Sequence, residues 1–250
     1  MTALTHLLSG ELNGSGRLVQ SLTHLSSTLE LLEGSLPLHS ASTLHDRMVR
    51  PFLIRSMLEV GCTILIGRID SFRLLSVAEL QSQATYEPGT KFSAAMQWSG
   101  DILSSEGRAP KDKWASTKRP EDMTRALLGD YVEELVVRPA FLALLDYLSQ
   151  APSGSTVGPW TEALRNMEPT NLVPRLRADA TRLYSTTSKG VHHEFVLSVA
   201  NYYDAPTIEQ LASDAVNLLG TLGLVVNFAE PALFRMPPER ALEFYEEIQP

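Results

Sequence analysis

The highest concentration of groups that could transfer a proton lies in the segment 182–195, RLYSTTSKGVHHEF. It contains two adjacent histidines, His192 and His193, from a total of six in the chain. An unperturbed histidine titrates near neutral pH, so either one could act as a general acid or base. The other side chains of the segment that could bind or orient a reacting group are Arg182, Tyr184, Ser188 and Lys189. We predict that these six residues form a catalytic site.

If this segment is helical, its polar side chains divide between two faces. Tyr184, Ser188 and His192 are four residues apart and share one face, whereas Lys189 and His193 share the adjacent face. The two histidines point about 100° apart, which disfavours binding of one metal ion by both. A metal site also needs three or four converging ligands, so we predict no metal and no cofactor. A structural role, with one histidine hydrogen-bonded between helices and the other solvated, is the alternative.

A second candidate contact surface is the segment 105–120, which is rich in Pro, Gly and Ser and is predicted to be a loop. Its basic residues surround one tryptophan: Arg108, Lys111, Lys113, Trp114, Lys118 and Arg119. Basic side chains beside an aromatic ring can hold a phosphate backbone and stack a base. We therefore predict nucleic-acid contacts here. The alternative is a solvated loop whose tryptophan packs against the protein body.

The composition indicates a globular protein with room for a substantial core. The chain has 250 residues, of which 44% are hydrophobic, and its formal net charge is -8. This charge disfavours a general nucleic-acid coat or a membrane-surface binder, although it allows a local basic groove. Cys62 is the single cysteine, which excludes a disulfide framework or a cysteine zinc site within one chain. It lies in an apolar run, so we predict a small core residue.

The sequence shows no sign of export or of membrane insertion. Its start lacks the basic region and apolar core of a signal peptide. The strongly apolar stretches near 57–66 and 218–229 are too short or too interrupted to span a membrane. We therefore expect a cytoplasmic protein with no membrane partner.

Helical periodicity dominates the elements that must position these candidate sites. One face of the first predicted helix, between 13–16 and Gly34, carries Leu18, Leu22, Leu25, Leu29 and Leu32. Further helices are expected at about 42–67, 76–86, 90–104, 121–149, 160–167, 171–200, 208–228 and 238–248. Capping-box patterns at 43–46, 76–79 and 207–210 predict three of their starts. Pro51 and Pro139 predict kinks or breaks.

These elements predict an all-α fold, a bundle of roughly seven to nine helices. No stretch alternates apolar and polar residues between hairpin turns, so no strand is expected. The Pro- and Gly-rich stretch 151–159 is the predicted boundary between an N-terminal helical part, 1–150, and a C-terminal part, 160–250. A single domain is the other interpretation.

The run 188–195, SKGVHHEF, with the polar helix before it and the apolar helix after it, resembles the late helix of HEPN-like proteins. The runs 55–59 and 68–73 are similar to the first long helix and turn of that family. The resemblance covers about 42–75 and 175–230. It implies a HEPN-like bundle from a bacterial defence or toxin–antitoxin system. It further implies metal-independent ribonuclease activity, RNA as substrate, and a homodimer or a defence-system partner protein.

One feature departs from the family pattern. Active HEPN members carry an arginine four to six residues before the catalytic histidine, whereas here Lys189 is three residues and Arg182 ten residues before His192. The vacant position could be filled in space by one of these two or by Arg47, Arg50, Arg55, Arg68 or Arg73. Arg55 and Glu59 are four residues apart and are predicted to pair.

The alternative function is a non-catalytic helical module for interaction or assembly.

Overall fold

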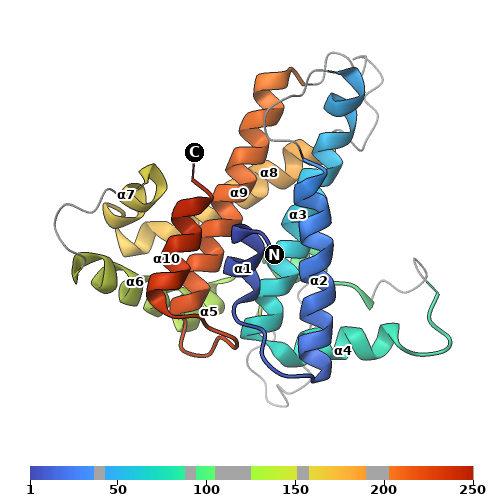
Figure 1. Cartoon of the computed structure of the whole chain (residues 1–250), viewed down its shortest axis with the longest axis horizontal. Helices are drawn as coiled ribbons and strands as arrows, with labels where there is room; N and C mark the ends of the chain where they lie inside the picture. Colours follow the sequence, from blue (N-terminus) through green and yellow to red (C-terminus); the bar gives the residue numbers. More distant parts are fainter. Residues whose placement is uncertain (37–42, 88–93, 105–124, 151–157, 190–202, 250) are drawn as a thin grey trace.

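The computed structural model describes residues 1–36, 43–87, 94–104, 125–150, 158–189 and 203–249 (Figure 1). These residues form helices and connecting turns, with no strand among them, which confirms the predicted all-α bundle. The helices are α1 (Ala3–Ser9), α2 (Arg17–Gly34), α3 (Leu44–Ile69), α4 (Ser71–Gln81), α5 (Asp130–Val132), α6 (Arg138–Gln150), α7 (Pro159–Arg165), α8 (Leu172–Lys189), α9 (Ala205–Phe228) and α10 (Pro238–Glu247). The sequence predicted roughly seven to nine helices and did not predict α1, which is too short for a clear periodic pattern.

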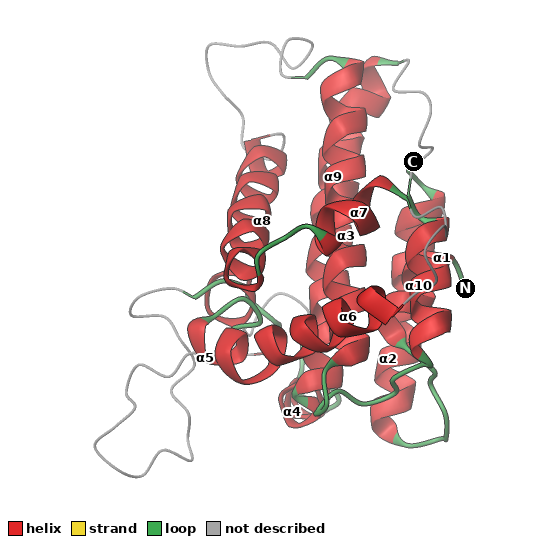
Figure 2. Cartoon of the chain, turned by 90° about the vertical axis from the view of Figure 1, so that its left-hand side faces the viewer, coloured by secondary structure: helices red, strands yellow, loops and turns green. Residues whose placement is uncertain are grey.

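Helix α9 lies at the centre of the bundle and packs against α1, α3, α6, α8 and α10 (Figure 2). Its length and composition would allow it to cross a membrane, but 72% of its most apolar window is buried inside the protein. The burial is that of a core helix and is compatible with a soluble protein. The helices of residues 1–150 and 160–250 contribute to one hydrophobic cluster, and the boundary between two parts stays a prediction.

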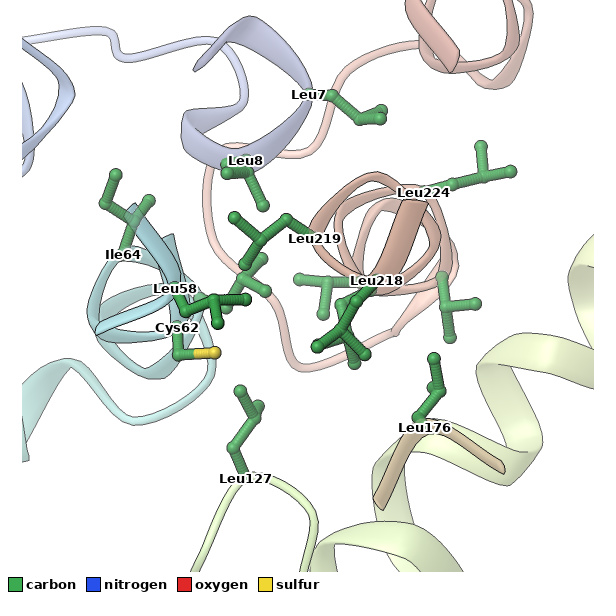
Figure 3. Close-up of a cluster of buried hydrophobic side chains, with 14 of the residues drawn as sticks. Leu7, Leu8, Leu58, Cys62, Ile64, Leu127, Leu176, Leu218, Leu219 and Leu224 are labelled. Atoms are coloured by element: carbon green, nitrogen blue, oxygen red, sulfur yellow. The ribbon is translucent and has the colours of Figure 1, made fainter. Parts of the chain in front are cut away.

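The close contact between α1, α3 and α9 depends on two glycines. A Cβ atom at Gly61 of α3 would lie 2.8 Å from a methyl carbon of Leu219, and one at Gly223 of α9 would lie 3.1 Å from Leu7 Cγ. Side chains from all three helices meet there: Leu7, Leu8, Leu58, Cys62, Leu218 and Leu219 (Figure 3). Burial raises the pKa of the Cys62 thiol to about 12, and the residue is the predicted core cysteine.

Of the three predicted capping boxes, one is confirmed and two are wrong. The box at 43–46 forms with both reciprocal hydrogen bonds and begins α3. Ser76 lies inside α4, which begins after Asp70, and α9 begins after Asp204. In each case an aspartate upstream of the expected start accepts a hydrogen bond from a backbone N–H of the first turn, so it caps the helix earlier.

The prolines have different effects in the two long helices. Pro51 lies inside a continuous α3, so it does not separate two helices. Near Pro139, the chain from α5 to α6 contains a π-helical turn, η3 (Glu133–Val137). Proline cannot donate a hydrogen bond and clashes with the preceding turn, and the wider π-helical turn accommodates both effects.

The predicted helix at 90–104 is wrong over its described part. Residues 94–104 contain a single π-type turn, η2 (Trp98–Ile102), in which Ser99 and Gly100 have non-helical dihedral angles. Gly100 has φ of 114°, a conformation that glycine adopts far more readily than other residues. The predicted loop at 105–120, residues 151–157 of the predicted loop at 151–159, and the predicted 171–200 helix from 190 onward lie outside the described residues.

Arg68, in the last turn of α3, joins three separate segments inside the core. Its side chain is fully buried and donates to the carbonyl oxygens of Leu7, Leu8 and Leu233 at 2.9–3.3 Å. It also donates to Asn227 Oδ1 at 2.9 Å. The α1 carbonyls lie at the negative end of that helix, where a cation is favoured. Burial lowers the pKa of Arg68 to about 9, so the guanidinium remains charged at neutral pH.

We predict that Arg68→Met lowers the free energy of unfolding by about 3 kcal/mol, because the acceptors that Arg68 satisfies would remain buried without their donor. Urea denaturation followed by circular dichroism measures this loss. Arg165→Met, which removes an exposed arginine paired with Glu162 at 3.5 Å, is the control and should change stability by less than about 1 kcal/mol. Equal losses in the two variants would contradict the assigned role.

Stability should also depend on His6, whose ring stacks on Phe244 with the centroids 4.8 Å apart. Burial, the N-terminal ammonium group and Arg240 lower its pKa below 6.5. The folded state therefore binds this proton less readily than the unfolded state, and stability falls as the pH drops through 6.5. The variant His6→Phe keeps an aromatic ring that can stack on Phe244, but this ring cannot bind a proton. Its unfolding free energy should decline less between pH 7.5 and 5.5 than that of the wild type, and identical profiles would refute this.

Candidate functional site

The predicted catalytic histidines, His192 and His193, lie outside the described residues, so their predicted role is not tested. The same holds for the predicted nucleic-acid contacts Arg108, Lys111, Lys113, Trp114, Lys118 and Arg119. Lys189 ends α8, and its side chain is also outside the described part. The structure therefore describes three side chains of the predicted catalytic group: Arg182, Tyr184 and Ser188.

These three residues separate into two groups on α8. Tyr184 and Ser188 both contact Arg55 of α3, and Ser188 Oγ donates to the Tyr184 carbonyl oxygen at 2.6 Å. Their predicted position on one face is confirmed. Arg182 instead pairs with Asp214 of α9 at 2.7 Å and with Asp179 at 3.6 Å. The structure therefore does not bring Arg182 together with the other two.

Arg55 is held at the contact between α3 and α8 by three hydrogen bonds. Its Nη2 donates to Tyr184 Oη at 2.5 Å, and its Nη1 donates to Ser188 Oγ at 3.3 Å. Its Nε donates to Glu59 Oε1 at 3.2 Å, which confirms the predicted pair. The side chain remains 25% exposed. Two polar residues of α8 and one carboxylate of α3 thus fix the orientation of a guanidinium that solvent can reach.

Trp98 completes this cluster from outside the two helices. Its ring stacks on the Tyr184 ring with centroids 4.3 Å apart and planes 7° from parallel. The Arg55 guanidinium carbon lies 4.4 Å from the centroid of the same tyrosine ring, a cation–π distance. Trp98 is only 7% exposed, so it supports Tyr184 and is not available to stack on a nucleobase.

The turn that presents Trp98 is fixed by charged groups. Asp101, which is buried, accepts a hydrogen bond from the Gln97 backbone N–H at 2.8 Å. It also pairs with Arg73 of α4 at 3.3 Å. Because a helix was expected at 90–104, this turn was not predicted. Trp98 was not among the predicted site residues. Gly100, between Ser99 and Asp101, was the sequence signal for a turn.

The Tyr184 hydroxyl is expected to stay protonated at neutral pH. Burial is the main cause that raises its pKa, while the Arg55 cation lowers it and the Glu59 carboxylate raises it. The net direction is upward. A neutral phenol can accept from Arg55 while donating to a carboxylate, so the group acts as a hydrogen-bonding support and not as a base.

Two other arginines that could supply the arginine expected from the HEPN resemblance have different partners. Arg68 is enclosed in the core by carbonyl groups. Arg73 pairs with Asp70 and Asp101 between α4 and the η2 turn. Among the hydrogen bonds of the described residues, those of Arg55 reach the end of α8, where Ser188 is four residues before His192 in the sequence.

Within the described ranges, no group of three His, Cys, Asp or Glu side chains is arranged to hold a metal ion. Comparisons with protein-family models, with curated proteins and with solved structures find no match to this chain.

We predict that Trp98→Ala destabilises the protein by about 3 kcal/mol or more, because it removes a large buried ring and its stack on Tyr184. Tyr184→Phe keeps the stack and loses one hydroxyl, so it should cost about 1 kcal/mol. Chemical denaturation of both variants gives the comparison. A larger loss for Tyr184→Phe than for Trp98→Ala would show that the hydroxyl, and not the aromatic stack, holds the cluster together.

Proposed function

We propose that this protein is a HEPN-like, metal-independent endoribonuclease of a bacterial defence or toxin–antitoxin system. The observation that supports this most strongly is the contact of Arg55 with Tyr184 and Ser188. It supplies an arginine next to the helix that leads to His192, where the resemblance requires one and the local sequence has none. In this proposal the arginine comes from α3, about 130 residues earlier in the chain.

The proposed reaction uses the ribose 2′-hydroxyl as nucleophile. His192 or His193 removes its proton, the oxygen attacks the adjacent phosphorus, and the bond to the 5′-oxygen of the next nucleotide breaks. That oxygen takes a proton from the second histidine or from water, leaving a 2′,3′-cyclic phosphate and a 5′-hydroxyl. Arg55 stabilises the additional negative charge on the phosphate oxygens in the transition state.

The cluster around Arg55 fits this role electrostatically. Glu59 balances the arginine charge in the free protein, and Tyr184 and Ser188 hold the guanidinium in place. A guanidinium has five N–H donors in a planar fork that matches phosphate oxygens. Preorganisation of this kind avoids reorientation during the reaction, which is the main source of electrostatic catalysis.

In this proposal the basic segment 105–120 contributes RNA contacts beyond the reacting phosphate, since the net charge of -8 requires a local positive surface. We further propose that a second copy of the chain, or a partner protein of the same defence system, completes the assembly. The second copy and the partner protein follow from the resemblance, whereas the RNA contacts follow from the basic residues around Trp114.

The test is cleavage of an end-labelled RNA in the presence of EDTA, with identification of a 2′,3′-cyclic phosphate product. We expect Arg55→Ala, and the double variant His192→Ala/His193→Ala, to lower the cleavage rate by about 100-fold or more. Arg175→Ala is the matched control, because this arginine also lies on α8 but is exposed and pairs with Asp179 at 3.8 Å, and its rate should stay within about threefold of the wild type.

Circular dichroism and thermal denaturation confirm that each variant is folded before its rate is interpreted. Equal rates for Arg55→Ala and the wild type would exclude Arg55 from the reaction. A folded wild-type protein that cleaves no RNA would contradict the nuclease proposal and favour the non-catalytic interaction module.

A further inference from the structure

A cavity of about 290 Å³ lies at the junction of α3, α5 and the π-helical turn η3. It is separate from the Arg55 cluster. Its wall is mainly apolar. Ile66 and Ile69 come from the end of α3, Val132 comes from α5, and Leu135 and Val136 come from η3. An apolar cavity of about 150 Å³ can bind benzene, so this one has room for a ring with a short chain attached.

Two apolar side chains on the wall are also open to solvent. Leu135 is 67% exposed and Tyr131 is 43% exposed, and both lie within or next to the π-helical turn. π-helical turns occur frequently at functional sites, and a large exposed leucine beside a cavity gives an entering ligand further apolar surface to cover.

The polar side of the cavity includes the ion pair of Arg125 with Asp70. Arg125 Nη2 lies 2.7 Å from Asp70 Oδ2, and Asp70 also faces Arg73 at 3.5 Å. The carboxylate is only 13% exposed and is held by its capping role in α4, whereas the Arg125 side chain is 45% exposed. Asp70 thus faces two guanidinium groups, of which Arg73 is shared with Asp101, and Arg125 has the greater solvent contact.

This distribution of charge selects the kind of head group that can bind. A cation approaching Asp70 would meet two arginines, which is unfavourable. An anion can approach the exposed side of Arg125, whose planar fork binds a carboxylate with charge-assisted hydrogen bonds. An alcohol would accept one hydrogen bond from Arg125 but would lack the charge and the second oxygen of a carboxylate, so it should bind more weakly.

We propose that this cavity binds a small amphipathic carboxylate, with its apolar body between α3 and η3 and its carboxylate on Arg125. This site is independent of the ribonuclease proposal, and its test requires no cleavage activity.

The experiment compares three molecules that share one apolar body: phenylbutyrate, phenylbutanol and phenylbutylamine. Binding to the full chain is measured by ligand-observed NMR titration. Phenylbutyrate should bind with a dissociation constant on the order of 0.1–1 mM, as expected for a ligand of this size. Phenylbutanol should bind about tenfold more weakly, and phenylbutylamine should bind most weakly of the three.

Two variants separate the head-group contact from the cavity. Arg125→Gln should weaken phenylbutyrate binding about tenfold while leaving phenylbutanol binding nearly unchanged. Val132→Phe places a ring in the cavity and should weaken binding of both. Arg165→Gln, at an exposed arginine on α7, is the control and should bind like the wild type.

Three results would overturn the proposal. The first is a failure of phenylbutyrate to bind the folded wild type at about 10 mM, well above the expected range. The second is equal or tighter binding of phenylbutylamine. The third is unchanged phenylbutyrate affinity in Arg125→Gln and Val132→Phe variants whose circular dichroism spectra match the wild type.

Discussion

The packing of α3 against α1 and α9 depends on the buried guanidinium of Arg68. One cation in the last turn of α3 satisfies carbonyl oxygens at the end of α1 and in the segment after α9, and it reaches Asn227 within α9. A buried charge without such partners would be strongly unfavourable. The end of α1, the end of α9 and the segment after α9 must therefore lie within hydrogen-bonding distance of the Arg68 guanidinium. The small residues Gly61 and Gly223 permit the same close approach by removing side-chain volume.

This constraint fixes α3 against α1 and the central helix α9, and α3 carries Arg55 to the end of α8. Arg55 and Arg68 are thirteen positions apart on one continuous helix, so the position of Arg68 helps to set the position of Arg55. The same helix end contributes Ile66, Ile69 and Asp70 to the apolar cavity. Structural and candidate functional arginines thus share one helix, but burial and solvent contact distinguish them.

Much of the fold follows from local sequence patterns. The leucine repeat predicted α2, the apolar run predicted α9, and the four-residue spacing predicted the Arg55–Glu59 pair. These features depend on residues close in sequence. The contacts of Arg55 with α8 join residues separated by 129 and 133 positions, and no local pattern encodes such a separation. The stack of Trp98 on Tyr184 was also not predictable, because a helix was expected where the η2 turn presents the tryptophan.

The central claim is that Arg55 and the histidines after α8 act on the same phosphate. The most direct measurement is an NMR titration of the arginine and histidine side-chain resonances with a short RNA whose reactive 2′-hydroxyl is replaced by hydrogen, so that it binds without being cleaved. The account predicts that the resonances of Arg55 and of His192 or His193 shift together with one binding curve, while that of Arg182 stays in place. Saturable RNA binding that shifts Arg182 and leaves Arg55 unchanged would contradict it.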